Sequence, residues 1–392
     1  MIRLFYLVSF LPGLVVPLGN GGVPSRYFSF AFFFSALRIS RLDLSLVMLI
    51  CFAAIYPVLA FPVRPFHLLD ISYLLSFIYF LFGVTIVRKR LLAFRRFVFV
   101  FWFLNVAYAA LQNVIINVMG GDSTFALLHQ NAHSPDYRIT PTVYFPYLYR
   151  VTGLFVESAP FVIYLIFTHF AFVLMRFGKG VVLVNLLFIF LSGAKVGIVF
   201  LVALAFISAP FFRRFSVISM MLLGAVLIAV FGSSLYEVMQ GIEGYGLQSV
   251  LIRMNWLSET ITHFSNSLPG VLFGYGYVST HDLIFDEAVE FHRGIDFFSI
   301  FVFSNGIIGS CLFLAPVFAW LWLNFDACKE HRNLLVIVVL LAFMTVGSLV
   351  NFQYAYLLFI VAYCSARKSS SKAVGYEEKT GRENKIQARA GL

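Results

Sequence analysis

Residues 181–207 read VVLVNLLFIFLSGAKVGIVFLVALAFI, an apolar run with one short break near its middle. Apolar runs of this kind are typical of helices that cross a bilayer, and one crossing takes about 20 residues. The run is too long for one crossing and too short for two full ones. The break at 192–195 divides it, so the pattern predicts two short helices, over 181–192 and 196–209, that meet at a turn.

The composition places the whole chain in the same class. Hydrophobic residues make up 61% of the 392 residues, charged residues only 12%, and the mean hydropathy is +0.91. The apolar runs are continuous, whereas membrane strands would alternate apolar and polar positions. We therefore predict an all-α polytopic integral membrane protein with about twelve transmembrane helices. The expected spans are 4–18, 24–37, 44–60, 71–87, 97–117, 154–175, 181–192, 196–209, 216–233, 298–323, 333–349 and 352–364.

Basic residues divide unevenly between the two sides of these helices. One side holds 21 of the 28 basic residues, and the other holds the remaining seven with 12 of the 18 acidic residues. Because Lys and Arg accumulate on the cytoplasmic side, both termini are predicted to be cytoplasmic. Four cysteines, Cys51, Cys311, Cys328 and Cys364, show no paired spacing, so neither a disulfide framework nor a metal site is expected.

The same charge rule places the turn at 192–195 on the outer side. Arg176/Lys179 and Arg213/Arg214 belong to the basic side, so an even number of crossings separates them. Lys195 then lies at an outward-facing turn. A lysine at bilayer depth costs roughly 2.5–3.5 kcal/mol, which favours a water-filled or anion-binding cavity, although a snorkelling lysine at a helix end is an alternative.

A long polar loop over 234–297 interrupts the apolar sequence on the outer side. It holds eight of the 18 acidic residues but only two basic ones, Arg253 and Arg293. Loops of this length between helices usually carry function. Residues 1–364 are expected to form one helical membrane domain that includes this loop, and 365–392 a disordered basic tail.

Three outer cations, Arg150, Lys195 and Arg253, come from different segments of the chain. Clustered cations beside apolar helices suit a lipid diphosphate whose headgroup lies at the membrane surface. A nucleic acid would need a broad basic face, and the outer side is net acidic. Fingerprints for ATP, a nicotinamide cofactor or HExxH zinc binding are absent from the sequence, so no cofactor is predicted.

Four strings of residues, in this order, resemble the O-antigen polymerase and O-antigen ligase superfamily. They cover about residues 140 to 310 and read RVTGLFVESA from Arg150, LSGAKVG from Leu191, RMNW from Arg253 with LFGYG from Leu272, and FFSIFVFSNGIIG from Phe297. The resemblance implies a bacterial inner-membrane enzyme. Such enzymes transfer glycan from an undecaprenyl diphosphate carrier on the periplasmic side, with inversion and without a metal.

The resemblance also implies roles for particular residues. Arg253 matches the large-loop arginine that faces the carrier diphosphate, and Lys195 stands where the family usually has arginine. Lysine keeps the charge but lacks the bidentate fork. The family often places a histidine before the last string, and here Asp296 or His292 stands nearest to that place. Either could accept the proton of the acceptor hydroxyl, or be an ordinary loop residue.

Other polar residues have competing interpretations. Glu157 could pair with Arg150 and stabilise a helix N-terminus, or could bind the acceptor. His169, inside an apolar run, is expected to hydrogen-bond a neighbouring helix rather than bind a ligand. Outer-loop tyrosines are interpreted first as an interfacial aromatic belt, with stacking on sugar rings as the alternative. Gly274 and Gly276 are expected to permit a tight backbone turn.

These features predict a glycosyltransferase that polymerises undecaprenyl-diphosphate-linked repeat units into exopolysaccharide or O-antigen. The expected partners are the lipid-linked oligosaccharide, the bilayer, and a chain-length regulator and flippase of the same pathway. Two alternatives remain open at this stage. One is a ligase that transfers the glycan to another acceptor. The other, from a different class, is a transporter for the lipid-linked glycan, although no internal repeat supports it.

Overall fold

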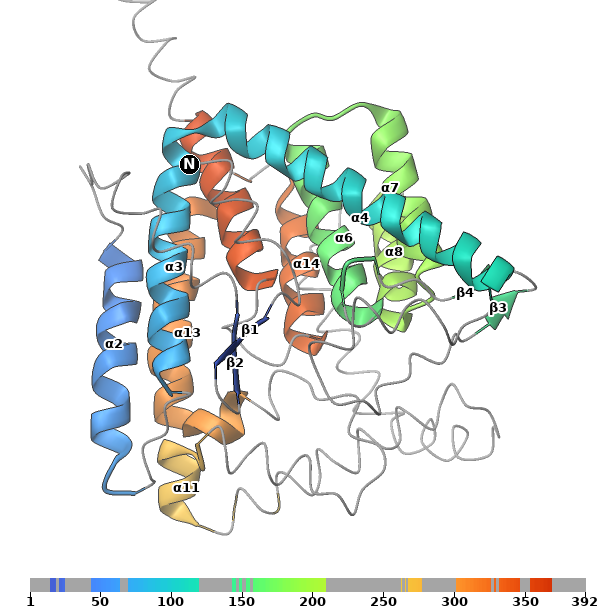
Figure 1. Ribbon diagram of the computed structural model, residues 1–392. Helices are drawn as coiled ribbons and strands as arrows, with labels where there is room; N and C mark the ends of the chain where they lie inside the picture. The colour runs from blue at the N-terminus through green and yellow to red at the C-terminus, as the bar shows by residue number, and fades with distance from the viewer. Residues whose placement is uncertain are drawn as a thin grey trace, which may run out of the picture.

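A computed structural model describes the parts of the chain that form the helical bundle in Figure 1. The described residues are 15–18, 21–24, 44–63, 70–119, 143–145, 148–149, 153–155, 158–208, 262, 265, 267–276, 301–325, 328, 331–345 and 353–368.

Helices dominate these residues because their sequences are continuously apolar. The helices are α2 (Leu44–Ala60), α3 (Asp70–Lys89), α4 (Leu91–Met119), α6 (Ser158–Leu174), α7 (Lys179–Leu191), α8 (Lys195–Ser208), α11 (Leu268–Phe273), α13 (Phe303–Phe325), α14 (Arg332–Thr345) and a helix over 353–368. Two short antiparallel pairs accompany them, β1 (Val15–Leu18) with β2 (Gly21–Pro24), and β3 (Val143–Phe145) with β4 (Leu148–Tyr149).

Most expected spans within the described residues coincide with helices, including the two short helices α7 and α8. The first span is wrong at its end, because residues 15–18 form β1 instead of helix. Pro17 has no N–H group for a helical hydrogen bond, and Gly21 and Gly22 of β2 follow closely. The expected span 216–233, and all of 24–37 except Pro24 at the end of β2, lie outside the described residues. At the other end of the chain, helix continues to residue 368, four residues past the expected boundary.

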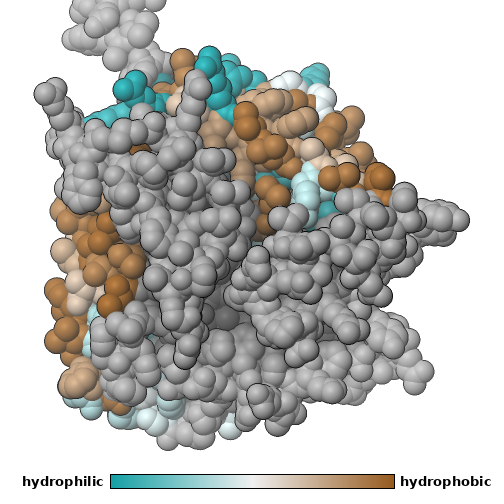
Figure 2. All heavy atoms as spheres, in the orientation of Figure 1, coloured by the Kyte–Doolittle hydropathy of each residue, from teal (hydrophilic) through white to brown (hydrophobic). Residues whose placement is uncertain are grey.

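Two of the described helices are long and apolar enough to cross a membrane, over Leu91–Val114 and Phe303–Asn324. Large apolar side chains are also exposed along α2, α4, α7 and α8, including Val58, Phe103, Leu183 and Phe206. The apolar surface along the flank formed by α2 is visible in Figure 2. Exposed apolar surface of this extent is compatible with a membrane protein.

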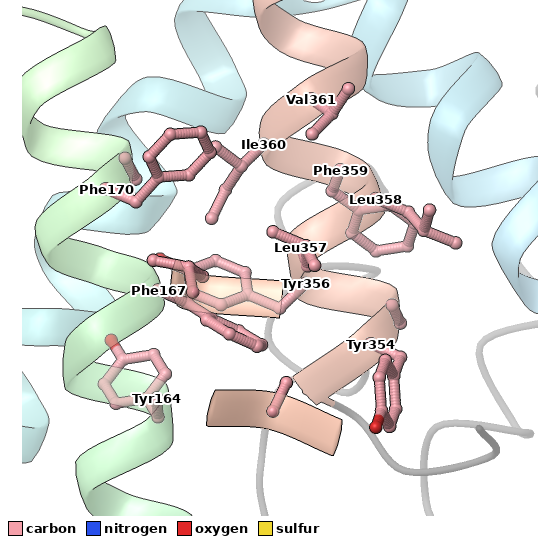
Figure 3. Close-up of a cluster of buried hydrophobic side chains, with 14 of the residues drawn as sticks. Tyr164, Phe167, Phe170, Tyr354, Tyr356, Leu357, Leu358, Phe359, Ile360 and Val361 are labelled. Carbon is pink, nitrogen blue, oxygen red and sulfur yellow. The ribbon is translucent and has the colours of Figure 1, made fainter. Parts of the chain in front are cut away.

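The core of the bundle is the contact between α6 and the helix over 353–368. Both are apolar all round and almost fully buried, as a central helix of a bundle must be. Figure 3 shows Tyr164 and Phe167 of α6 facing Tyr356. The rings of Tyr164 and Tyr356 stack with their centroids 5.5 Å apart, and the Tyr356 hydroxyl lies 3.2 Å from the Thr168 hydroxyl.

Side-chain contacts join several helix ends at one end of the bundle. Arg88, at the end of α3, donates a hydrogen bond of 3.0 Å to the side-chain oxygen of Asn324, at the end of α13. Beyond α13, the Cys364 thiol donates a hydrogen bond to Cys328, which lowers the pKa of the Cys328 thiol. The end of α3, the end of α13 and the end of the helix over 353–368 therefore lie together.

Two further contacts bring α4 and α6 to the same end. Arg367 donates to the carbonyl of Leu174, the last residue of α6, at 3.4 Å. Arg95, near the start of α4, lies 4.9 Å from the ring centre of Phe177, in the turn between α6 and α7. We call this the basic end, because all Lys and Arg residues whose side chains are described lie here: Arg88, Lys89, Arg90, Arg95, Arg96, Arg176, Lys179, Arg332, Arg367 and Lys368.

The basic end confirms that the cation-rich loops of these residues share one side. Asp70, the one acidic residue within the described ranges, begins α3 at the opposite end. Figure 2 shows hydrophilic surface gathered at the top of the molecule, where these helix ends lie in Figure 1.

The end of α6 predicts a stabilising substitution. Arg176 follows this helix with a φ of 55°, and the Phe177 N–H donates to the Phe172 carbonyl at 2.9 Å. This is the left-handed helix end that glycine adopts without a steric cost. Arg176→Gly should therefore raise the thermal midpoint in detergent by the equivalent of about 1 kcal/mol. Arg176→Gln, which loses the charge but keeps the strain, should not, and equal midpoints for both variants would contradict this account.

Candidate functional site

The turn Gly153-Leu154-Phe155 is held against α4 by two amide side chains. Gln112 accepts a hydrogen bond of 3.0 Å from the Gly153 N–H and donates one of 3.1 Å to the Gly153 carbonyl. Asn105 accepts from the Leu154 N–H at 3.2 Å. Asn105 and Gln112 stand seven residues apart, about two helical turns, so both side chains project from one face of α4.

This turn tolerates no side chain at its first residue. Gly153 has a φ of 57°, and a Cβ placed there would lie 2.6 Å from the Phe161 ring of α6. The turn is thus clamped between α4 and the start of α6. Arg150 and Glu157, which lie just outside the described residues, flank the turn in the sequence.

The tip between α7 and α8 is a second glycine turn. Gly193 has a φ of 62°, and the Ser192 hydroxyl donates to the Ile189 carbonyl at 2.6 Å. A Cβ at Gly197 would lie 3.0 Å from the Ile189 carbonyl oxygen, so the two helices meet closely just beyond the tip. Lys195, whose side chain is not described, is the first residue of α8. The predicted break is confirmed at the residues expected.

A buried amide fixes the α7–α8 hairpin to the bundle. Asn185 of α7 donates to the Leu165 carbonyl of α6 at 3.0 Å, and its oxygen accepts from the Trp102 indole of α4 at 2.9 Å. Both halves of the amide are used, and the side chain is fully buried. Polar contacts of this kind join helices where no water competes.

Two strings of the resemblance lie directly against each other at the start of α13. The N–H groups of Tyr275 and Gly276 donate to the carbonyls of Phe303 and Ser304, both at 3.0 Å. The rings of Tyr275 and Phe303 stack with centroids 4.7 Å apart. Tyr275 therefore packs on the protein itself on at least one ring face.

Glycines allow this backbone contact. Gly274 and Gly306 have φ values of 75° and 65°, and a Cβ at either would lie 2.4 Å from a backbone atom of the other segment. Gly276 has a φ of 83°. The expectation that Gly274 and Gly276 permit a backbone turn is confirmed, and the turn proves to be one half of a two-segment joint.

Side chains of α2 and α3 close around this joint. The Tyr56 hydroxyl lies within hydrogen-bonding reach of the Phe273 and Asn305 carbonyls. The Asn305 side chain donates to the Phe301 carbonyl at 2.9 Å and to the Tyr73 hydroxyl at 3.3 Å. Three other segments, α2, α3 and residues 273–276, therefore fix the start of α13.

All these turns lie at the end of the bundle opposite the basic end. Along α4, Gln112 lies about 30 Å from the first residue of the helix, which is at the basic end, because an α-helix rises 1.5 Å per residue. The helices α6 and α8 begin at the opposite end. The helix α13 also begins there, and its residue Asn324 lies at the basic end. We call it the glycine end, because it holds every described glycine with positive φ: Gly153, Gly193, Gly274, Gly276 and Gly306.

The charged candidates are only partly placed. Arg150, Glu157, Arg253, His292 and Asp296 lie outside the described residues, so their contacts stay predictions. His169 lies in α6, where its Nδ1 atom has no hydrogen-bond partner among the described residues. Its ring instead contacts Phe200 of α8 edge-on at 5.5 Å. The expected interhelical hydrogen bond is not found at Nδ1.

Sequence reasoning missed the residues that build the turns, namely Asn105, Gln112, Asn185, Asn305, Tyr56 and Tyr73. A signal was present, because an amide inside a continuously apolar helix needs a partner inside the bundle. The partners themselves were not readable, since most of them lie far away in the sequence.

No protein-family model, curated protein or solved structure matches the chain.

The glycine joint can be tested by adding single methyl groups. Gly274→Ala or Gly306→Ala should lower the thermal midpoint in detergent strongly, because each places a Cβ 2.4 Å from backbone atoms in a conformation unfavourable for alanine. Gly180→Ala is the matched control, since nothing lies within 4 Å of its added Cβ. An unchanged midpoint for both joint variants would contradict the close approach.

The two hydrogen bonds between Gln112 and the Gly153 backbone predict a loss of stability when the Gln112 amide is removed. Gln112→Leu leaves two buried backbone groups of Gly153 without this partner, at about 1–3 kcal/mol each. The variant should melt several degrees below the parent. In the control, Thr85→Val removes a hydroxyl that donates at 2.8 Å to the Leu81 carbonyl of its own helix, so the midpoint should change little. Equal changes in the thermal midpoint for Gln112→Leu and Thr85→Val would show that the Gln112 side chain does not hold the Gly153 turn.

Proposed function

We propose that this protein is a multi-spanning bacterial inner-membrane glycosyltransferase that polymerises undecaprenyl-diphosphate-linked repeat units. The observation that carries the proposal is the placement of the strings resembling O-antigen polymerases and ligases. Each of the four strings has a glycine at the glycine end, namely Gly153, Gly193, and Gly274 with Gly306 at their joint. The RMNW string with Arg253 belongs to the same large loop as Gly274.

Segregation of charge supports a membrane orientation for this end. The described cations gather at the basic end, which we assign to the cytoplasm by the positive-inside rule. The glycine end then faces the periplasm. Two helices of full crossing length, α4 and α13, connect the two ends. A lipid-linked glycan that has reached the outer leaflet would meet the glycine end.

The proposed reaction is glycosyl transfer between two lipid-linked glycans. A hydroxyl oxygen of the acceptor attacks the anomeric carbon of the donor sugar, the bond from that carbon to the diphosphate oxygen breaks, and undecaprenyl diphosphate leaves. The hydroxyl proton passes to a base, for which Asp296 and His292 are the candidates. Arg253 and Lys195, with Arg150, hold the diphosphate and stabilise its developing charge. Attack opposite the leaving group inverts the anomeric carbon.

One observation favours an enzyme over a transporter. A transport path is expected to carry charged side chains through the bundle interior. Among the described side chains, the Lys and Arg residues lie at the basic end, and the interior polar groups are mainly amides and hydroxyls. Asn185 and Asn305 among them donate hydrogen bonds to neighbouring helices. Gln112 and Asn105 hold the Gly153 turn in place, as a fixed scaffold for a reaction requires.

The test removes the central cation of the proposal. Arg253→Ala should abolish long polymer in a strain that depends on this protein, because the leaving diphosphate loses its main partner. Arg253→Lys should retain part of the activity, since it keeps the charge without the fork. Polymer length on a glycan gel is the measurement, and membrane levels of each variant are the control.

A cation at the basic end provides the matched control for Arg253→Ala. Arg332→Ala, at the basic end, should leave polymer length unchanged. Normal polymer from Arg253→Ala at normal protein levels would refute the proposal. A ligase is distinguished by its need for an acceptor other than the lipid-linked repeat unit.

A further inference from the structure

The turn between α6 and α7 is surrounded by cations from three helices. Arg95 and Arg96 come from α4, Arg176 and Lys179 from the turn itself and the start of α7, and Arg367 from the helix over 353–368. We call these five residues the basic cluster.

Two members of the cluster are fixed by neutral groups that leave their charge in place. Arg95 lies over Phe177, whose ring also stacks on Phe99 at 5.9 Å and an interplanar angle of 8°. Arg367 donates to the Leu174 carbonyl, at the negative end of the α6 dipole. An aromatic face and a carbonyl orient a guanidinium without neutralising it. The remaining three cations are exposed.

The cluster borders exposed apolar surface. Val100, one turn after Arg96 along α4, is 53% exposed, and Leu183, one turn beyond Lys179 along α7, is 69% exposed. Both apolar residues lie one helical turn farther from the basic end than the cations. This places the cations at the depth where phospholipid headgroups meet their acyl chains. Asp70, the one acidic residue within the described ranges, lies at the glycine end.

We propose that the basic cluster binds anionic phospholipid headgroups of the cytoplasmic leaflet. The phosphate lies among Arg96, Arg176 and Lys179, and the acyl chains follow the apolar flank of α4 and α7. The charges are complementary, and the adjoining apolar surface selects a lipid over a free anion. This proposal rests on the membrane orientation proposed above but not on glycosyl transfer, so its test needs no glycan.

The test measures lipid-dependent thermostability of the full chain in a neutral detergent. Dioleoyl phosphatidylglycerol is titrated against dioleoyl phosphatidylcholine, with inorganic phosphate in a third arm. The parent should gain stability with phosphatidylglycerol only. The gain should shrink between about 0.15 M and about 1 M NaCl, because the screening length falls from about 8 Å to about 3 Å.

The variant that decides is Arg96→Gln with Arg176→Gln and Lys179→Gln. Each cation near an anionic surface strengthens binding about fivefold, so half-maximal stabilisation should need on the order of 100-fold more phosphatidylglycerol. The matched control, Arg26→Gln with Arg64→Gln and Arg138→Gln, removes the same charge from residues assigned to the outer side by sequence. It should respond like the parent.

Three results would overturn the proposal. They are an unchanged response in the cluster variant, an equal loss in the control variant, and stabilisation by inorganic phosphate that matches the lipid. None of these results depends on polymer formation. Absence of glycosyltransferase activity would therefore not contradict lipid binding, and absence of lipid binding would not contradict glycosyl transfer.

Discussion

The structure depends on one constraint, which is that every buried break in a helix must find partners for its freed backbone groups. Helices satisfy their own backbone, but the turns at Gly153 and Gly193 and the joint at Gly274 do not continue the helical pattern. Gln112 supplies both a donor and an acceptor to Gly153, and the start of α13 supplies carbonyls to the segment after Gly274. Apolar packing brings the helices together, and these hydrogen bonds decide where each turn rests.

The same constraint explains why the two ends of the bundle differ. Most cations at the basic end lie on exposed or half-buried positions near short connections, where water or headgroups can solvate them. At the glycine end, backbone approaches backbone, and only glycine fits at Gly274 and Gly306, where a Cβ would lie 2.4 Å from backbone atoms. An end built from fixed backbone turns suits the positioning of a substrate, which gives the proposed reaction its physical basis.

Much of the fold was predictable from the sequence, because long apolar runs fix helices with little help from context. The helices α2, α7 and α8 begin and end within two residues of the expected spans, and the break before Lys195 follows from chain length and charge alone. The strand β1 was missed because only four residues and a proline distinguish it from a helix end. The partners of Gln112 and Tyr56 could not be predicted, since they depend on contacts between residues 41 and up to 249 positions apart. The charged site residues stay sequence-based predictions, with only the backbone of Lys195 placed.

The proposed diphosphate site is assigned to the glycine end, where none of the described Lys and Arg side chains lies, and photo-crosslinking tests this assignment most directly. The probe is an undecaprenyl diphosphate analogue with a photoreactive group next to the diphosphate, bound to the full chain in detergent and mapped by peptide mass spectrometry. We expect adducts in peptides that contain Arg150, Lys195 or Arg253. Adducts confined to peptides with Arg95, Arg176 or Lys179 would contradict the proposed site.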